Sequence, residues 1–316
     1  KLKKKFKCKK INDLMYEIKI PDDLFYNIKS LAINYISKSF NDGETITEEK
    51  KLINKLIKKR ALLKNVTPNG IIVPKNEISL EFNNFLKGYV EIIKFLNFSE
   101  LIDKFHFPPN LRIKFPKISK SHMSRKHPTE LMHADTWTGA NPNWIAVHLF
   151  LLGDISKNNI RYAMPPKNFQ EKWLQPLRYS EDGKKISEKF KVINYTPKKG
   201  HMIFADASII HQSFRKKNSG MRISLDTGFD MKMKKLLQDI EKKIKEKIPC
   251  DKLILIDNSY LHKKHKSFDE KKIHLKMQIT SSYLKKMKPI ESNRLIFSAL
   301  KDEIKDKIHA LQIEIK

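Results

Sequence analysis

Residues 197–229, PKKGHMIFADASIIHQSFRKKNSGMRISLDTGF, carry the strand pattern that best indicates the fold of the first part of the chain. A turn is followed by an apolar strand and then by His211. In MRISLD, residues 221–226, apolar and polar residues alternate. This period of two puts Arg222 and Ser224 on one face of one strand. An arginine beside a hydroxyl suits a carboxylate, because the guanidinium binds it bidentately and the hydroxyl adds a hydrogen bond.

The chain on the N-terminal side of this stretch divides into two patterns. From about residue 110 to 230, short strands such as LRIKFP and WIAVHLFLL are separated by loops rich in Pro, Asn and Gly. This pattern is typical of a β-sandwich or barrel. Residues 11–105 carry apolar side chains at helical spacing and are predicted to be mostly helical.

After Phe229 the pattern changes again. KKLLQDIEKKIKEKI predicts a helix, DKLILIDNS and KKIHLKMQIT predict strands, IESNRLIFSALKDEIKDK predicts a helix and HALQIEIK a last strand. We therefore expect two domains with a boundary near Asp230. Residues 1–230 would form the first and residues 231–316 a small α-β-β-α-β domain, which gives an α+β protein overall.

The charge of the chain is strongly positive. Of 316 residues, 64 are Lys or Arg and 35 are Asp or Glu, a net charge of +29. Such a balance raises nucleic acid or an anionic membrane as partner. Lysine is spread through nearly every segment, however, which favours general lysine enrichment over a dedicated nucleic-acid surface. The hydrophobic fraction of 40% is enough for real cores and argues against wholesale disorder.

The cysteine count and the apolar runs indicate the cellular compartment that we expect. Cys8 and Cys250 cannot make a disulfide framework or a zinc ribbon, so a reducing cytoplasm fits. No apolar run approaches the roughly 18 residues of a membrane span. The basic start KLKKKFKCKK has no apolar segment behind it, so we expect no secretory signal. Whether the N-terminus is complete stays open, since the chain does not begin with Met.

A second motif, HADTWTGANPNW, occupies residues 133–144. His133 and Asp135 are separated by one residue, which alone is weak evidence for a metal site. With His211 they make two histidines and one carboxylate, the facial triad of non-haem Fe(II) oxygenases. That triad leaves three coordination positions open, enough for a 2-oxo acid and O₂.

The order His-x-Asp, strands, His and Arg-x-Ser resembles the Fe(II)/2-oxoglutarate-dependent dioxygenases. The resemblance covers about residues 110–230 and implies a double-stranded β-helix, or jelly roll, with the preceding helices as a buttress. It implies that His133, Asp135 and His211 bind Fe(II). It also implies that Arg222 and Ser224 bind the far carboxylate of 2-oxoglutarate. The activity implied is hydroxylation of a substrate.

HADTWTGANPNW together with RYAMPP is most similar to the oxygenases of bacterial carbohydrate and surface-polysaccharide gene clusters. A small polar substrate, for which a carbohydrate derivative is one candidate, is therefore expected. Tyr162 is a further candidate for cofactor binding, and Trp137 and Asn143 are candidate pocket residues. For Trp137 and Tyr162 a packing role is the favoured alternative.

The remaining histidines of this region are expected to be structural or solvated. His201 follows a glycine, where many relatives carry Asp, and is expected to be structural. His148 lies within WIAVHLFLL and is expected to be a core histidine with its polar atoms satisfied. His122 and His127 lie in a polar loop and are expected to be solvated.

The C-terminal segment is similar to a BolA domain, whose fold is like a class II KH domain. The resemblance runs from about Leu236 to Ile315. It is strongest at residues Ala299, Leu300, Glu303, Ile308, His309, Ala310 and Leu311. Two family patterns are absent. The usual Arg-His-Arg reads SNR at residues 292–294, and the usual Phe-x-Gly reads YLKK at residues 283–286.

This resemblance implies a monothiol glutaredoxin as partner and a shared [2Fe–2S] cluster, with imidazole ligation from the BolA side. His309 matches the C-terminal ligand of the family. The second ligand would be His262 or His265, for which solvated loop histidines are an equal alternative. His274 is expected to be a surface residue and Cys250 a small buried one.

Nucleic-acid binding is the alternative for this domain. Residues 231–316 carry 22 Lys and Arg against 12 Asp and Glu, which favours phosphate contacts. Class II KH binding uses a GXXG loop, and these residues include no glycine, so cluster binding ranks higher. For the whole chain, the alternative to an oxygenase is a non-enzymatic iron–sulfur trafficking or nucleic-acid-binding adaptor on a degenerate jelly-roll scaffold.

Overall fold

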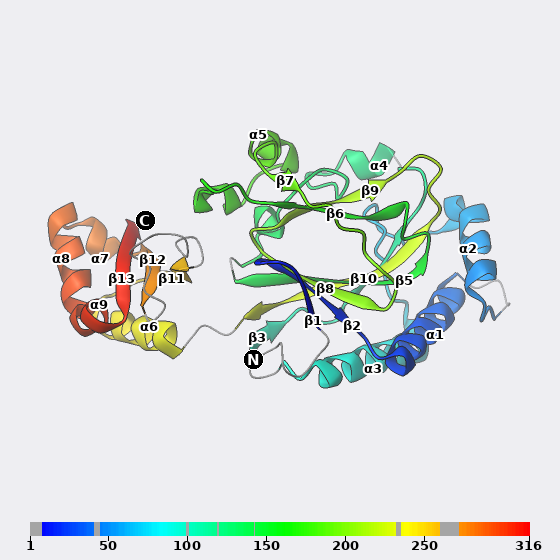
Figure 1. Cartoon of the computed structure of the whole chain (residues 1–316), viewed down its shortest axis with the longest axis horizontal. Coiled ribbons are helices and arrows are strands. Elements are labelled where there is room, and N and C mark those ends of the chain that lie inside the picture. Colours follow the sequence, from blue (N-terminus) through cyan, green and yellow to red (C-terminus); the bar gives the residue numbers. More distant parts are fainter. Residues whose placement is uncertain are drawn as a thin grey trace. The chain divides into compact units, whose positions relative to one another are not determined.

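The computed structural model describes residues 8–40, 45–98, 101–118, 120–141, 143–231, 235–259 and 272–316. The chain divides into two compact units, an N-terminal unit of Lys1–Met231 and a C-terminal unit of Lys232–Lys316 (Figure 1). Each unit has its own hydrophobic core. No helix among the described residues is long and apolar enough to cross a membrane.

The N-terminal unit is built on a seven-stranded sheet. Its strands are β1 (Cys8–Asn12), β2 (Met15–Lys19), β3 (Ile102–Phe105), β4 (Asn110–Lys114), β5 (Trp144–Gly153), β8 (His201–Asp206) and β10 (Arg222–Met231). The order is β1-β2-β8-β5-β10-β3, and β4 also pairs with β10. The neighbours in this sheet are antiparallel.

A three-stranded sheet lies over the first one (Figure 1). Its strands, in the order β7-β6-β9, are β6 (Asn158–Met164), β7 (Lys191–Val192) and β9 (Ile210–Arg215). Two antiparallel sheets packed face to face make the jelly roll that the sequence predicts. A small core between the sheets includes Phe150, Ile160 and Ile203.

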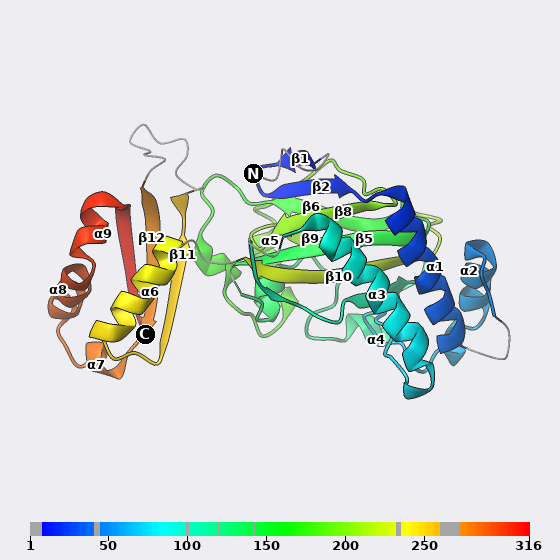
Figure 2. The same ribbon diagram turned by 90° about the horizontal axis from the view of Figure 1, so that it is seen from below.

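Helices cover the outer face of the large sheet (Figures 1 and 2). They are α1 (Asp22–Ser39) and α3 (Ser79–Leu96), while α2 (Glu49–Lys58) lies at the end of the sheet and the short helices α4 (Lys120–Met123) and α5 (Lys184–Ser187) lie elsewhere in the unit. Apolar side chains at helical spacing on α1 and α3 pack with the outward-facing residues of β5, β8 and β10 in the main core. This helical layer is the predicted buttress.

The alternation of β10 decides which side chains reach the space between the sheets. Ile223 and Leu225 belong to the core under the helices. Because side chains alternate along a strand, Arg222, Ser224 and Asp226 face the opposite way, toward the small sheet. The period-two pattern of MRISLD is thus realised in the fold.

The prediction that residues 11–105 are mostly helical is wrong at both ends of the range. Residues 8–19 form the β1–β2 hairpin, and β2 pairs with β8. At the other end α3 stops where Asn97 adopts a left-handed conformation with φ 49°, and β3 follows. Both strands are stabilised by partners more than 100 residues away in sequence, and helical spacing cannot reveal such pairing.

The C-terminal unit has the predicted α-β-β-α-β order. Its elements are α6 (Lys235–Lys247), β11 (Lys252–Asp257), β12 (Ile273–Thr280), α7 (Ser282–Lys285), α8 (Pro289–Ala299), α9 (Lys301–Asp306) and β13 (Ile308–Ile315). The sheet order is β11-β12-β13, with β11 antiparallel and β13 parallel to β12. The helix predicted as continuous is broken at Leu300 into α8 and α9.

Candidate functional site

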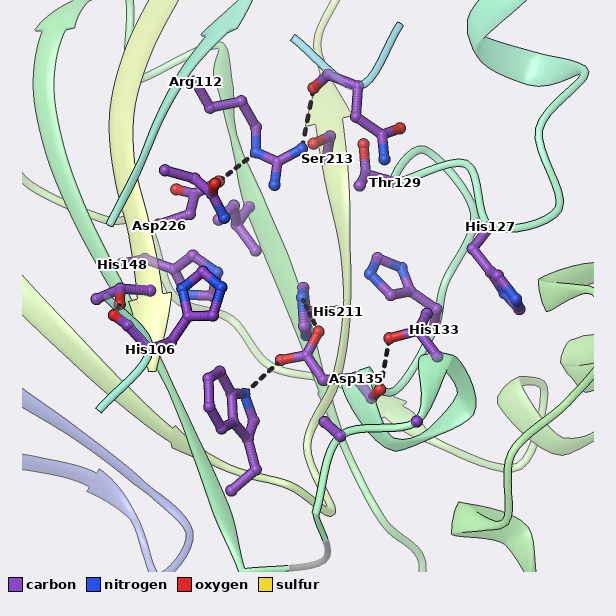
Figure 3. A pocket seen from close by; sticks show the side chains of 18 of the residues that line it. His106, Arg112, His127, Thr129, His133, Asp135, His148, His211, Ser213 and Asp226 are labelled. Carbon is purple, nitrogen blue, oxygen red and sulfur yellow. Dashed lines mark hydrogen bonds and ion pairs between the residues drawn. The ribbon is translucent and has the colours of Figure 1, made fainter. Parts of the chain in front are cut away.

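A pocket of about 630 Å³ opens between the two sheets of the N-terminal unit. Its lining comes from β5, β9 and β10 and from the loop that carries the His-x-Asp motif. Figure 3 shows His133, Asp135 and His211 pointing toward one another, with Arg112, Ser213 and Asp226 farther along the wall. Polar and charged side chains make up most of this wall.

His133, Asp135 and His211 each offer one ligand atom, and these atoms all lie within 4.8 Å of one another. Among the described residues this is the one group of three that could hold a metal ion. The His133 and His211 rings are 4.6 Å apart, and His211 Nε2 is 3.7 Å from an Asp135 oxygen. Two imidazoles and a carboxylate on one side of a point fit Fe(II) and leave the opposite positions open.

The backbone places the two histidines together. His133 and His211 form an isolated antiparallel bridge, with N–H to C=O distances of 3.0 and 2.8 Å in the two directions. The segment of the His-x-Asp motif thereby adds to the edge of β9. His133 and His211 are 78 residues apart in sequence. These two hydrogen bonds, with a third from the Ser213 N–H to the Thr129 carbonyl at 2.6 Å, fix the register of the two segments.

The orientation of His133 suits a metal ligand. Its Nδ1 lies 2.8 Å from the carbonyl oxygen of Leu131. Because a carbonyl can only accept, Nδ1 carries the proton and Nε2 keeps its lone pair for a metal. Burial, and then the neighbouring His211, lower the pKa of His133 to about 3. The ring is therefore neutral, as a ligand must be.

Asp135 opens a 3-10 turn, Asp135–Thr138, that aims its carboxylate into the pocket. Trp144, at the start of β5, donates its indole N–H to Asp135 Oδ2 at 3.0 Å. Burial raises the pKa of Asp135, but His211 and His133 lower it by more, so the carboxyl group stays ionised. Trp144 leaves the other oxygen, Oδ1, facing His211.

Arg222 is fully buried and lines the same pocket. Its guanidinium lies 5.1 Å from the centre of the Phe150 ring, and Nη2 is 3.4 Å from the Ser213 hydroxyl. Its Nε and Nη1 are buried and have no hydrogen-bond partner among the described residues. Burial lowers the pKa of Arg222 to about 10, which leaves it charged at neutral pH. A buried cation with unpaired donors fits an anionic ligand such as a carboxylate.

Other predicted site residues do not line the pocket. Ser224 is buried beside Arg222, but its hydroxyl donates to Asp226 at 2.8 Å. The Tyr162 hydroxyl is 3.1 Å from His148 Nδ1, behind the pocket wall. Trp137 is buried and donates to the Trp173 carbonyl at 2.6 Å, a packing role. The Asn143 N–H donates to the Asn141 side-chain oxygen at 2.9 Å, and its carbonyl accepts from the Met231 N–H at the end of β10 at 3.2 Å.

An ion pair that the sequence reasoning missed forms the far wall. Arg112 on β4 contacts Asp226 at 2.5 Å through Nε and the Asn69 carbonyl at 3.0 Å through Nη1 (Figure 3). Burial raises the pKa of Asp226, but Arg112 and His148 lower it by more, so that the pKa falls to about 2. Asp226 alternates with Leu225 in MRISLD, so period two already put it on the face of Arg222. The pairing with Arg112 had no local signal.

The predictions for the other histidines have mixed outcomes. His148 is buried and hydrogen-bonded as expected, and it also lines the pocket; burial lowers its pKa to about 4. The expectation of a solvated side chain is wrong for His122 and only partly met for the half-buried His127. His122 is buried against Glu130, and His127 lines the pocket with Nδ1 3.0 Å from the Ser180 hydroxyl. His201 pairs with the buried Glu17, a structural role.

In the C-terminal unit His309 is exposed near the start of β13. Its ring lies 4.7 Å from that of His274 on β12, with a tilt of 31° between the planes. His274 is half-buried, so the expectation of a plain surface residue is only partly met. His262 and His265 lie outside the described residues. Cys250 is half-buried and free.

The C-terminal unit matches a known protein family. Residues 244–316 match the family model described as BolA-like protein. The UV-induced protein uvi31 of Schizosaccharomyces pombe is 33% identical over 78 residues, which are 23% of this chain and 76% of that protein. The BolA domain of SufE1 from Arabidopsis thaliana is 28% identical, over 27% of this chain and 94% of that one, with a TM-score of 0.24.

The comparison with solved structures also matches the N-terminal unit. An N-substituted L-amino acid dioxygenase from Burkholderia ambifaria is 11% identical, over 69% of this chain and 85% of that one, with a TM-score of 0.36. A prolyl-4-hydroxylase from Pseudomonas putida is 12% identical, over 66% of this chain and all of that one, with a TM-score of 0.31.

Proposed function

We propose a function for each of the two units of this chain, which belongs to the BolA-like protein family through its residues 244–316. The N-terminal unit is an Fe(II)- and 2-oxoglutarate-dependent dioxygenase. The C-terminal unit is a module that shares a [2Fe–2S] cluster with a monothiol glutaredoxin. A reducing cytoplasm suits both, because neither Cys8 nor Cys250 forms a disulfide.

One observation carries the dioxygenase proposal: the triad and the unpaired Arg222 guanidinium line the same pocket. His133, Asp135 and His211 would hold the iron. Arg222 would bind the far carboxylate of 2-oxoglutarate, with the Ser213 hydroxyl beside it. When bound, Fe(II) and 2-oxoglutarate would supply hydroxylation of the substrate by O₂, in which one oxygen atom enters the substrate and the other enters succinate as 2-oxoglutarate loses CO₂.

The other pocket residues orient the metal ligands and set the polarity of the pocket. Trp144 holds the Asp135 carboxylate so that one oxygen is left for the metal. His148, neutral because burial lowers its pKa, fills the wall behind the triad without adding charge. The Arg112–Asp226 pair and the neighbouring amides of Asn110 and Asn141 give the rest of the pocket a polar lining. This lining supports a small polar substrate, and a carbohydrate derivative is one candidate class.

Anaerobic titration tests the dioxygenase proposal. Fe(II) followed by 2-oxoglutarate should produce a weak visible charge-transfer band at roughly 500 nm, because the open facial triad lets the 2-oxo acid chelate the iron. His211→Ala should abolish the band. His127→Ala, which changes a lining histidine outside the triad, should retain it. Iron binding without a band, in wild type, would contradict the proposal.

The position of His309 supports the second proposal. It lies exposed near the start of β13, where a partner's cluster can reach its imidazole. Mixing the full chain with a monothiol glutaredoxin, glutathione, iron and sulfide should give a heterodimer with a visible spectrum unlike that of the glutaredoxin homodimer. His309→Ala should abolish the difference. Of the His262 and His265 variants, only the one that removes the second ligand should reduce this spectral difference.

His274→Ala is the matched comparison for His309→Ala, because the two rings lie 4.7 Å apart. If only His309→Ala removes the spectral difference, the ligand role belongs to His309. An unchanged spectrum in both variants would indicate that the C-terminal unit has a structural role and binds no cluster through these histidines. In that case nucleic-acid binding by this lysine-rich unit is the alternative to measure, through its salt dependence.

A further inference from the structure

A second cavity of about 200 Å³ lies in the N-terminal unit and shares Asn69 with the metal pocket. It is bounded by the end of β4 and by the segment between α2 and α3. Its charged lining residues are Arg60, Lys114, Lys117, Glu130 and Arg215. No part of the proposed oxygenase chemistry uses this cavity.

The floor of the cavity is a buried cluster of ionisable side chains. Buried Glu130 is 3.2 Å from Lys114 Nζ and 2.9 Å from Arg215 Nη1. His122 also contacts Glu130, but burial and Lys114 lower the pKa of this histidine, so its ring is neutral. Burial lowers the pKa of Lys114 to about 7, so this amine is only partly charged near neutral pH, and Arg215 offsets the Glu130 carboxylate. A bound anion would favour the charged form of Lys114.

The wall adds more positive charge around one aromatic residue. The guanidinium of Arg60 lies over the Phe115 ring, 4.6 Å from its centre. Arg215 Nε donates to the Phe115 carbonyl at 2.7 Å. Two guanidinium groups thus flank Phe115, and Lys117 lines the same cavity. Glu130 is the one acidic residue among the described residues of the lining, so a concave wall with low dielectric focuses a positive potential here.

We propose that this cavity binds a small phosphate-class oxyanion between Arg60 and Arg215. Guanidinium groups bind such oxygens bidentately, and Arg60 brings a guanidinium to this cavity in addition to Arg215. The volume is below the roughly 300–1,000 Å³ of sites for drug-sized ligands, which suits a phosphate group. Lys114 donates to the Thr129 hydroxyl, which lines the metal pocket. The anion would therefore lie two side chains from that pocket.

Isothermal titration of the metal-free full chain with inorganic phosphate, at fixed ionic strength, tests the proposal. Wild type should bind one phosphate per chain. Arg60→Gln should weaken the affinity about tenfold or more, because one charge-assisted interaction is lost. Lys117→Gln should weaken it in the same direction, and its side chain is exposed, so the fold should survive.

Arg161→Gln is the matched control. Arg161 also lies over a phenylalanine ring, 3.4 Å from the centre of Phe214, but it does not line the cavity. It removes the same charge from this basic chain and should leave the phosphate affinity unchanged. The proposal fails if wild type shows no saturable heat, if Arg60→Gln binds as well as wild type, or if Arg161→Gln weakens binding equally.

Discussion

At the scale of single residues, Arg222 is the side chain with the least satisfied hydrogen-bonding capacity in the pocket, since Nε and Nη1 lack partners among the described residues. Arg222→Met keeps much of its apolar volume and removes the charge. We expect 2-oxoglutarate binding to weaken by about 2–5 kcal/mol, because a buried charge pair loses one partner. Iron binding, measured separately by anaerobic titration, should survive. Unchanged cosubstrate affinity would place the anchor elsewhere, with Arg112 as the next candidate.

Trp144 gives a second test at this scale. Its indole N–H holds Asp135 at 3.0 Å, a contact of the kind that orients metal ligands. Trp144→Phe should lower Fe(II) affinity about 10–100-fold, by analogy with other losses of such contacts. Trp137→Phe is the control, because that indole N–H binds the Trp173 carbonyl instead. Equal affinities of the two variants for Fe(II) would show that Asp135 needs no help in orientation.

At the scale of elements, the first turn of α2 is tied to the end of β5. Glu49 accepts the backbone N–H of Gly153 at 2.8 Å and pairs with Lys29 and Lys199, each at 2.7 Å. Burial raises the pKa of Glu49, but these partners outweigh it and lower the pKa to about 2. A carboxyl group with a lowered pKa stabilises the fold fully above its unfolded value near 4.5. That stability is lost as the pH falls through 2.

Glu49→Gln should therefore lower the free energy of unfolding by about 1–3 kcal/mol at pH 7. It should also flatten the loss of stability between about pH 4.5 and 2, measured by denaturant unfolding at several pH values. Glu48→Gln is the control, because Glu48 is exposed and its one ion pair with a described residue is to Lys51 in the next turn, at 2.7 Å. A cost at Glu48 as large as that at Glu49 would show that the tie to β5 contributes nothing.

How far the elements could be predicted depends on how local their signals are. β10 was predictable, because Met221, Ile223 and Leu225 alternate with polar residues within six positions. The β1–β2 hairpin was not, since its pairing with β8 comes from residues near position 200. The burial of His122 was missed for the same reason: its partner Glu130 is buried by Lys114 and Arg215, which arrive from separate strands. A polar loop in sequence can thus fold into an ion cluster.

The candidate site shows the same division. The residue types of the triad and the Arg-x-Ser motif were readable, because each occupies a short pattern. The direction of the Ser224 hydroxyl was not, since it depends on Asp226, and Asp226 in turn on Arg112. The bridge that joins His133 to His211 is a long-range contact as well. Sequence spacing can predict which residues are ligands. The contacts that each of these residues makes depend on side chains from other strands.

At the scale of the whole molecule, the two units have separate cores with no residue in common. Differential scanning calorimetry should therefore show two transitions. Anaerobic Fe(II) with 2-oxoglutarate, at 100 times the dissociation constant, should stabilise only the N-terminal unit, by about 2.7 kcal/mol. For a unit of this size that raises its midpoint by about 5–10 °C. His211→Ala should lose the shift and leave the other transition in place. One transition that moves as a whole would mean that the two units unfold together.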